Sequence, residues 1–267
     1  MRPDVCYHAD RWRADHICNL YSVMSSRAEI ARWTDLAADY NHNAPPMPGV
    51  HPDYPAPVVL KDEAGKRVMR DLRWGMPSSS QALFMAAKKR AAGLRAKGKD
   101  FDFNELLKME PDRGTTNVRN TQSKHWTRWL DPAHRCLVPM TSFAEPDQVS
   151  GSKENTWFAL DESRPLAFFA GIWTGWTCVR KISEGLVTCD LFAFLTTDAN
   201  ADVGVVHEKA MPVILTEAAE WDAWMSDKPW AAVAHLQRPL PNGALKVVAR
   251  GGKFDPAGAK TPVGDLI

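Results

Sequence analysis

The sequence predicts a single α+β domain in which a curved, mostly antiparallel β-sheet or barrel is flanked by helices. Short apolar and aromatic segments typical of strands recur along the chain, separated by turn residues. Helical patterns are few, and neither an alternating strand–helix rhythm nor an internal repeat is present. The 267 residues are 45% hydrophobic and 24% charged, an ordinary globular composition that excludes wholesale disorder.

The first elements follow a short leader. Residues 1–17 carry charges throughout and show little apolar periodicity. Residues 18–23 predict a strand, and residues 25–40 a helix capped by Ser25 or Ser26. Residues 41–57 contain six prolines and predict an extended loop that is neither helix nor central strand. Residues 58–77 predict two strands around a turn.

The remaining elements complete the predicted sheet. Residues 81–99 form a basic helical stretch that stops at Gly98, and residues 101–112 form a short amphipathic segment. Strands are expected at 135–140, 156–160, 166–176, 191–197 and 244–250, and a helix at 217–225. We therefore expect a leader (1–17), one folded domain (18–255) and a tail (256–267).

Charge and cysteine content limit the classes of function. The formal net charge is +1, so a nucleic-acid surface must be a local patch. No apolar run approaches the roughly 20 residues of a membrane helix, and the N-terminus lacks the apolar core of a secretory signal. The cysteines are odd in number and show no CxxC spacing, which argues against a disulfide framework and a Cys-rich zinc site. We expect a cytoplasmic protein without a metal or organic cofactor.

Polar residues at predicted strand ends and loops are the candidates for chemistry. The sequence has no HExxH, GxxxxGK[ST] or GxSxG motif. The remaining candidates are Cys18, Asn117, Arg119, Glu145 and His207. The other cysteines of the domain, Cys136, Cys178 and Cys189, sit in apolar segments and are interpreted as core residues.

The candidate residues lie within a series of motifs that resembles a known family. CNLYS (18–22), WGMP (74–77), TNVRNT (116–121), RCLVPMTSFAEP (135–146), FFAGIW (168–173) and LTTDAN…VHEKAMPVIL (195–215) occur in one order. This order is similar to that of the SOS response-associated peptidase (SRAP) family, and it covers roughly residues 17 to 250. Members of the family process abasic sites and crosslink to damaged single-stranded DNA.

The resemblance implies a role for each candidate. Cys18 matches the catalytic cysteine, which in the family is N-terminal after Met removal. Asn117 and Arg119 match a pair that holds the amine of that cysteine and contacts DNA phosphate. Glu145 matches a proton shuttle, and His207 a histidine that assists opening of the sugar.

The resemblance also implies a DNA surface. Trp74 and Pro77 are expected to form a stacking wedge under a base, with Arg73, Arg119 and Lys209 towards phosphates. Lys209 replaces a residue that is often Arg in relatives, which keeps the charge and loses bidentate geometry. The basic stretch Lys88–Lys99 is either a solvated helix face or a further DNA contact.

The position of Cys18 leaves the chemistry open. A thiazolidine with an abasic-site aldehyde needs both a free α-amine and the thiol, and an internal cysteine has no free amine. Translation starts at codon 17, or the leader is cleaved autoproteolytically between Ile17 and Cys18, or the leader is retained and no crosslink forms.

Two other functions compete with covalent capture. One is a conventional thiol peptidase or amidase that uses Cys18, His207 and Asn117. The other is a non-covalent module for single-stranded DNA that keeps the leader. The expected partner is single-stranded DNA containing abasic sites, and the expected state is a monomer.

Overall fold

The structure is a computed structural model that describes residues 18–36 and 45–259. The predicted leader, residues 37–40 of the helix predicted over 25–40, and the tail from residue 260 lie outside the described residues. That helix is shorter than predicted: it ends at Thr34, where Asp35 adopts a left-handed conformation with φ 51°. The helices are α1 (Arg27–Thr34), α2 (Ser80–Arg95), α3 (Phe103–Lys108), α4 (Lys124–Thr127), α5 (Ala201–Gly204), α6 (Ala218–Trp224) and α7 (Trp230–Val233), with 3-10 turns η1 (Ala234–Leu236) and η2 (Pro256–Ala259). No helix within the described ranges is long and apolar enough to span a membrane.

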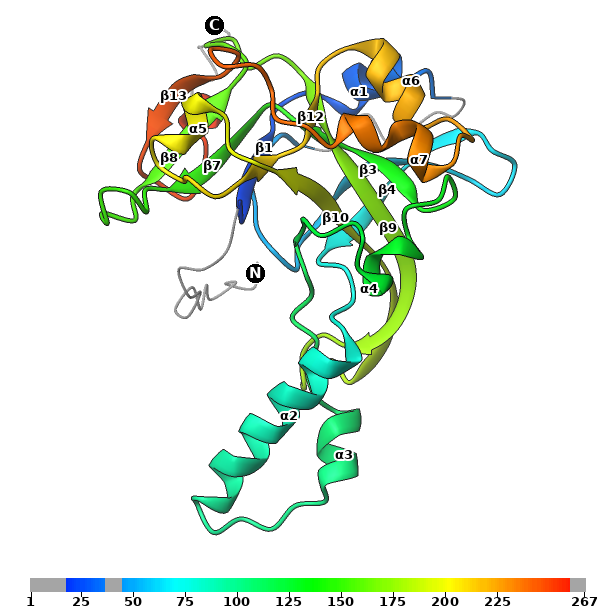
Figure 1. Cartoon of the computed structure of the whole chain (residues 1–267), viewed down its shortest axis with the longest axis vertical. Helices are drawn as coiled ribbons and strands as arrows, with labels where there is room; N and C mark the ends of the chain where they lie inside the picture. Colours follow the sequence, from blue (N-terminus) through cyan, green and yellow to red (C-terminus); the bar gives the residue numbers. More distant parts are fainter. Residues whose placement is uncertain (1–17, 37–44, 260–267) are drawn as a thin grey trace, which may run out of the picture.

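The strands form a barrel and an adjoining sheet (Figure 1). They are β1 (Leu20–Val23), β2 (Met47–Val50), β3 (Pro55–Lys61), β4 (Arg67–Trp74), β5 (Asn117–Val118), β6 (Arg135–Met140), β7 (Ser142–Pro146), β8 (Asn155–Ala159), β9 (Ala167–Val179), β10 (Leu186–Thr197), β11 (Met211–Pro212), β12 (Ile214–Leu215) and β13 (Lys246–Arg250).

The barrel closes in the order β3–β4–β10–β9–β6, with β6 pairing back to β3. Its neighbours are antiparallel except β4 and β10, which run parallel with Trp74 opposite Phe192. The long strands β9 and β10 curve together along its wall (Figure 1). The predicted α+β class with a curved, mostly antiparallel barrel flanked by helices is therefore confirmed.

The second sheet has the order β13–β8–β7–β1–β2 and carries the N-terminal strand of the described chain. Tyr21 of β1 is fully buried, and its ring meets Trp74, Phe169 and Phe194 edge-on at 5.1, 5.6 and 6.1 Å between centroids. This aromatic contact fixes β1, and Cys18 just before it, against the barrel interior.

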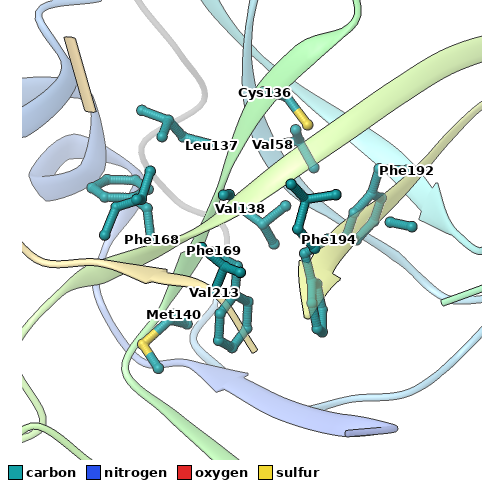
Figure 2. Close-up of a cluster of buried hydrophobic side chains, with 14 of the residues drawn as sticks. Val58, Cys136, Leu137, Val138, Met140, Phe168, Phe169, Phe192, Phe194 and Val213 are labelled. Carbon is teal, nitrogen blue, oxygen red and sulfur yellow. The ribbon is translucent and has the colours of Figure 1, made fainter. Parts of the chain in front are cut away.

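Alternation along β9 explains how the barrel is filled on both sides. Phe169 packs on Phe194 inside the barrel with the rings tilted and 4.4 Å between centroids, whereas the preceding Phe168 packs at 4.9 Å on Trp221 of α6 (Figure 2 shows Phe168, Phe169 and Phe194). Successive strand residues point to opposite faces, so one strand contributes to both layers. Trp224 of α6 completes the outer layer by donating its indole N–H to the Cys136 carbonyl at 2.9 Å.

Most predicted elements are present, but the proline-rich segment is not only a loop. Met47–Val50 and Pro55–Lys61 form strands β2 and β3, so the prediction for residues 41–57 is wrong in these parts. Pro48 is tolerated because β2 is the edge of its sheet. Pro55 and Pro57 are tolerated because β3 pairs with β6 only through Val59 and Leu60.

A helical hairpin extends away from the barrel. Helices α2 and α3 pack on each other, with Phe84 edge-on to Phe103 at 5.6 Å, and together they project below the barrel (Figure 1). Ser79 caps α2 by accepting from the Ala82 N–H, and Asp102 caps α3. We call residues 78–112 the arm.

Replacing Phe169 with Ala should lower the free energy of unfolding by about 3–5 kcal/mol, because the cavity would lie among buried rings. Urea denaturation measures the loss. Ile182→Ala, at a side chain 54% exposed, is the control and should change stability by less than about 0.5 kcal/mol. A loss below about 1 kcal/mol for Phe169→Ala would contradict this description of the core.

Candidate active site

Cys18 lies directly before β1, fully buried, with its backbone nitrogen against a carboxylate. Its N–H donates to both oxygens of Glu145, at 3.0 Å to Oε1 and 3.1 Å to Oε2. The sheet register produces this contact. Leu20 lies opposite Ala144 in the antiparallel pair of β1 and β7, so Glu145, the next residue of β7, lies beside the residues that precede β1. The structure thus brings together two candidates that are 127 residues apart.

Burial controls the protonation of this carboxyl group. Glu145 is fully buried, and burial raises its pKa well above the ordinary value, although the hydrogen bond from the Cys18 N–H opposes the shift. A carboxyl group with a raised pKa keeps its proton towards neutral pH and can act as a general acid.

The thiol of Cys18 has a raised pKa, whereas an activated nucleophilic thiol has a lowered one. Burial raises the pKa of the Cys18 thiol and the nearby Glu145 raises it further, against a smaller lowering by the Leu20 backbone. The S–H group donates to the Leu20 carbonyl at 3.7 Å. Activated thiols have a lowered pKa and a basic partner. Within the described part of the chain, the thiol has no such partner, so it is held as a neutral S–H.

Asn117 holds the other side of Cys18. Its Nδ2 donates to the Cys18 carbonyl at 3.0 Å and to Thr116 Oγ1 at 2.9 Å. Thr116 in turn donates to Asn19 Oδ1 at 3.1 Å. Asn117 belongs to β5, which is fixed by parallel pairing with β10 opposite Phe194. Asn117 thus lies beside Cys18 and binds its carbonyl, whereas the resemblance implied a contact with its amine.

His207 is buried in the turn after α5, with its ring bonded locally. Nδ1 lies 3.0 Å from the Ala210 carbonyl oxygen. Over residues 18–36 and 45–259, the ring makes no hydrogen bond to Cys18 or Glu145. The carbonyl of the preceding residue, Val206, accepts from the Gln148 N–H at 2.9 Å, and Gln148 lies just beyond the end of β7. His207 therefore borders the strand of Glu145 without contacting the thiol.

Arg119 and Lys209 are neighbours, held together by a hydrogen bond from the Arg119 side chain to the Lys209 backbone. The guanidinium of Arg119 donates to the Lys209 carbonyl at 3.1 Å and to the Thr197 carbonyl at 2.7 Å, and it pairs with Asp198. Its side chain remains 42% exposed, and Lys209 is exposed. Both cations are accessible to a phosphate.

The predicted stacking wedge is not exposed. Trp74 is fully buried, stacked on Phe194 at 5.3 Å, and donates its indole N–H to the Thr116 carbonyl at 3.2 Å. Pro77 is also buried. The expectation that these two rings present a surface to a base is corrected here: WGMP is packed into the barrel, where Trp74 supports the Thr116–Asn117 segment.

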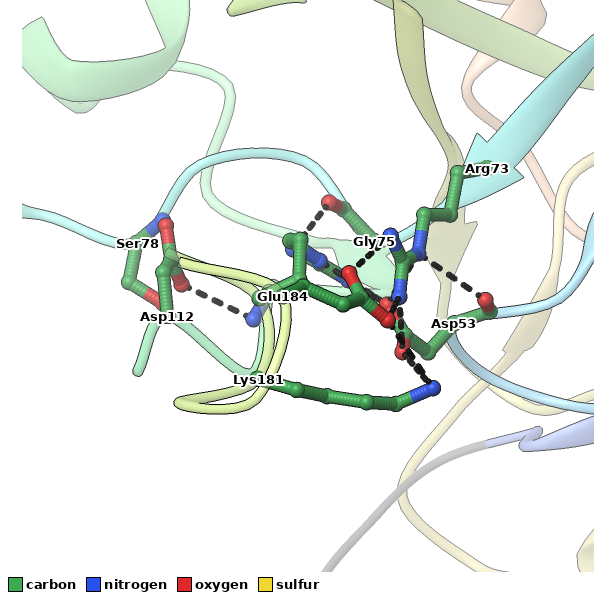
Figure 3. A network of polar contacts seen from close by, with 9 residues as sticks. Asp53, Arg73, Gly75, Ser78, Asp112, Lys181 and Glu184 are labelled. Carbon is green, nitrogen blue, oxygen red and sulfur yellow. Dashed lines mark hydrogen bonds and ion pairs between the residues drawn. The ribbon is translucent and has the colours of Figure 1, made fainter. Parts of the chain in front are cut away.

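Arg73 is likewise occupied by ion pairs within the protein (Figure 3). It binds Asp53 at 2.7 Å and Glu184 at 2.9 Å. Asp53 also accepts from Arg180 Nε at 2.8 Å. Partial burial raises the pKa of Asp53, but the hydrogen bonds from both arginines outweigh it and hold that pKa below its ordinary value. The phosphate contact expected of Arg73 is therefore not available in this structure.

The ion-pair network of Asp53, Arg73 and Arg180 also holds the base of the arm in place. The sequence did not indicate this role. Arg180 Nη1 donates to the Gly75 carbonyl at 3.1 Å. Gly114 has φ +75°, and a Cβ there would lie 2.7 Å from both Arg180 Nη1 and the Gly75 oxygen. Asp112 accepts from the Ser78 N–H at 3.0 Å and the Gly114 N–H at 2.8 Å (Figure 3 shows Asp112 and Ser78). Arg180 was missed because its partners are distant in sequence.

The remaining cysteines show no comparable setting. Cys136 is fully buried, Cys178 is 8% exposed and Cys189 is half-buried; burial raises the pKa of all three thiols. No group of His, Cys, Asp or Glu in the described ranges is arranged to hold a metal ion.

Comparison with known proteins assigns the family. The family described as SOS response associated peptidase (SRAP) matches residues 17–249. The chain belongs to this family, which confirms the resemblance found in the motifs and supports a role in the DNA damage (SOS) response. No curated protein matches the chain significantly.

Solved structures share the fold. A protein from Bacteroides thetaiotaomicron is 19% identical, with a TM-score of 0.60 over 86% of this chain and 90% of its own. A protein from Bordetella bronchiseptica is 18% identical, with a TM-score of 0.56 over 88% and 98%. A phage-related protein from the same organism is 18% identical, with a TM-score of 0.57 over 86% and 92%. At these identities, the likeness concerns the fold.

Replacing Glu145 with Gln should remove a pH dependence of stability. With its pKa raised in the folded state, Glu145 retains a proton that the unfolded chain loses above about pH 4.3, so its contribution falls as pH rises towards the folded pKa, by at most about 1.4 kcal/mol per pH unit. Urea unfolding between pH 4.5 and 8 should show this slope in the native protein and a smaller one in Glu145→Gln. Equal slopes would contradict the assignment.

Proposed function

We propose that this protein captures abasic sites in single-stranded DNA covalently through Cys18, once the amino group of Cys18 has been freed. The observation that carries the proposal is the Cys18 nitrogen, 3.0 and 3.1 Å from the two Glu145 oxygens in a fully buried setting. Membership of the SRAP family supports the DNA damage context.

The nitrogen of Cys18 is a suitable nucleophile when free. An α-amino group has a pKa of about 8 and a lysine about 10.4, so far more of the former is neutral at pH 7. The open-chain form of an abasic site presents an aldehyde. A Cys18 ammonium would favour the ionised form of Glu145, because a neighbouring opposite charge lowers the pKa of a carboxyl group; the carboxylate would then take the ammonium proton and leave the neutral amine.

Capture would proceed in two bond-forming steps. The amine adds to the aldehyde carbon, and the resulting hydroxyl leaves as water with a proton from Glu145, giving an imine. The Cys18 sulfur then adds to the imine carbon, and the thiol proton passes to the nitrogen. The product is a five-membered thiazolidine, and the sum of the steps loses one water. A neutral thiol, as burial dictates here, carries the proton that this addition needs.

Release of the amine would use the same pair. The thiol of Cys18 attacks the carbonyl carbon of Ile17, its proton passes by way of Glu145 to the amide nitrogen, and the C–N bond breaks to give a thioester and a free amine. Water then hydrolyses the thioester: its hydroxyl goes to the Ile17 carbonyl carbon, and its other proton returns to the sulfur as the thiol. The Glu145 contact to this nitrogen supports the step, which would make the protein a cysteine-dependent autopeptidase.

The neighbouring side chains would position the reactants. Asn117 would hold the Cys18 carbonyl and so help to keep the amine next to Glu145. His207, bordering the end of β7, would polarise the sugar oxygen during ring opening. Arg119 and Lys209 would contact phosphates, whereas Trp74, Pro77 and Arg73 would act by supporting the segments around the site.

The state of the thiol disfavours a conventional thiol peptidase or amidase acting on other chains. Such an enzyme must turn over many substrates and needs a thiolate with a basic partner, whereas release of the leader is a single intramolecular event at an adjacent peptide bond. Here the thiol pKa is raised and the His207 ring is bonded to Ala210. A non-covalent module for single-stranded DNA with the leader retained is the remaining alternative. It predicts salt-dependent binding without a covalent product.

The same proposal covers location and partners. The protein would act in the cytoplasm as a monomer, associated with the nucleoid when bound to DNA, without a cofactor.

Intact mass spectrometry, before and after mixing with single-stranded DNA containing one abasic site, tests the proposal. We expect a mass that begins at Cys18, and an adduct equal to protein plus DNA minus one water. Cys18→Ala should give neither product, and Cys189→Ala, which removes a half-buried thiol elsewhere, should give both. A full-length mass without adduct would contradict covalent capture and leave the binding module.

Replacing Glu145 with Gln should slow adduct formation about 10²–10⁴-fold, because Gln cannot exchange protons with the amine or the leaving hydroxyl. Time courses on denaturing gels, using protein already processed to Cys18, give the rate. Glu162→Gln, at an exposed carboxylate, should leave it unchanged. A Glu145→Gln rate within threefold of the native rate would exclude the shuttle role.

A further inference from the structure

The arm is rooted in the candidate active site. It leaves the barrel after the WGMP segment and returns through Thr115, which forms a backbone bridge with Met76. Two residues later comes Asn117, which contacts Cys18. Asp112 joins the two ends of the arm, because its carboxylate accepts from the Ser78 N–H at one end and the Gly114 N–H next to the other. A strand of DNA that reaches Cys18 therefore passes near the base of the arm.

The arm carries a charge that differs in sign from the rest of the chain. Residues 78–112 contain seven Lys and Arg against five Asp and Glu, a net charge of +2. The whole chain has a formal charge of +1, so the remainder is −1. Positive charge is thus concentrated on the element that projects furthest below the barrel (Figure 1).

The acidic side chains of the arm are mostly engaged within it. Asp102 caps α3, and Glu110 pairs with Arg90 at 3.2 Å. Glu105 lies 4.0 Å from Lys108.

Most of its cations are free of such partners. Across the described ranges, no carboxylate lies within 4 Å of five exposed basic side chains: Lys88, Lys89, Arg95, Lys97 and Lys99. These cations therefore remain available to an external polyanion.

The surroundings of these cations favour a flexible polyanion over an apolar partner. Lys88 lies over the Phe84 ring at 5.1 Å, and Arg95 over the Phe101 ring at 5.2 Å, so charge screens the aromatic surface. Only Ala87 and Ala91 of α2 are buried. The 16 residues of α2 span about 24 Å, which matches about seven phosphates of a stacked strand.

We propose that the arm is a second DNA-binding surface, which holds the phosphate backbone of the DNA that continues beyond the lesion. This inference rests on the proposed function, since DNA at Cys18 is what brings a flanking strand to the arm. The flank is either single-stranded or duplex, and both present the same phosphate chemistry.

Fluorescence anisotropy on the Cys18→Ala background, with a tetrahydrofuran abasic analogue, tests the arm without covalent capture. The variant is Lys88→Gln/Lys89→Gln/Lys97→Gln/Lys99→Gln. On a 30-nucleotide strand it should bind at least about 10-fold more weakly at 50 mM salt, with a salt slope smaller by up to about 3. On an 8-nucleotide strand, too short to reach the arm, it should bind as its parent does. A 30-nucleotide substrate with one duplex flank shows which kind of flank is held.

A matched control neutralises four exposed lysines on the barrel end and the adjoining sheet: Lys66→Gln/Lys228→Gln/Lys246→Gln/Lys253→Gln. It should retain parental affinity. Equal weakening by both variants, or no weakening by the arm variant on either 30-nucleotide substrate, overturns the proposal. Adduct formation is measured separately, in the native protein and in the arm variant with Cys18 intact. An adduct from the arm variant shows that this variant is folded. If the native protein forms no adduct, covalent capture is wrong, but the binding result for the arm still stands.

Discussion

The structure depends on one contact, the backbone nitrogen of Cys18 against both oxygens of Glu145. A buried carboxyl group is costly unless it is neutral or fully hydrogen-bonded. Among the residues that the structure describes, Glu145 accepts from one donor group, and its pKa is raised. The surrounding fold keeps the pair dry and in register. Antiparallel pairing of β1 with β7 sets the spacing, and Asn117 closes the site from β5. The same burial raises the pKa of both Glu145 and the thiol, so in the proposed capture the nitrogen would react before the sulfur.

Two packing features position this contact. Tyr21 inserts its ring among Trp74, Phe169 and Phe194, which anchors β1 to the barrel only three residues after Cys18. On the opposite side, the ion-pair network around Asp53 and Arg180 binds the Gly75 carbonyl and limits movement of the segment that leads to the arm. Rigid support on both sides allows the arm to project without loosening the site.

Local patterns in the sequence predicted much of the fold. Apolar runs located the strands of the barrel wall, and Ser26 was identified as one of two candidate caps of α1. The proline-rich strands were missed because the cost of proline depends on whether its N–H faces a neighbour, which only the sheet order decides. Trp74 and Arg73 were misjudged for the same reason: burial and ion pairing come from residues far along the chain, such as Phe194, Asp53 and Glu184. The pairing of Cys18 with Glu145 was indicated by the family motifs and not by spacing.

The separation of Cys18 and Glu145 in the sequence determines when the site can form during synthesis. Cys18 meets Glu145 across 127 residues and Asn117 across 99. A chain still emerging from the ribosome cannot assemble this centre until more than half of it has been synthesised and β7 has paired with β1. If the leader is cleaved as proposed, folding would time the maturation at Cys18, and the free amine would appear only inside a finished domain.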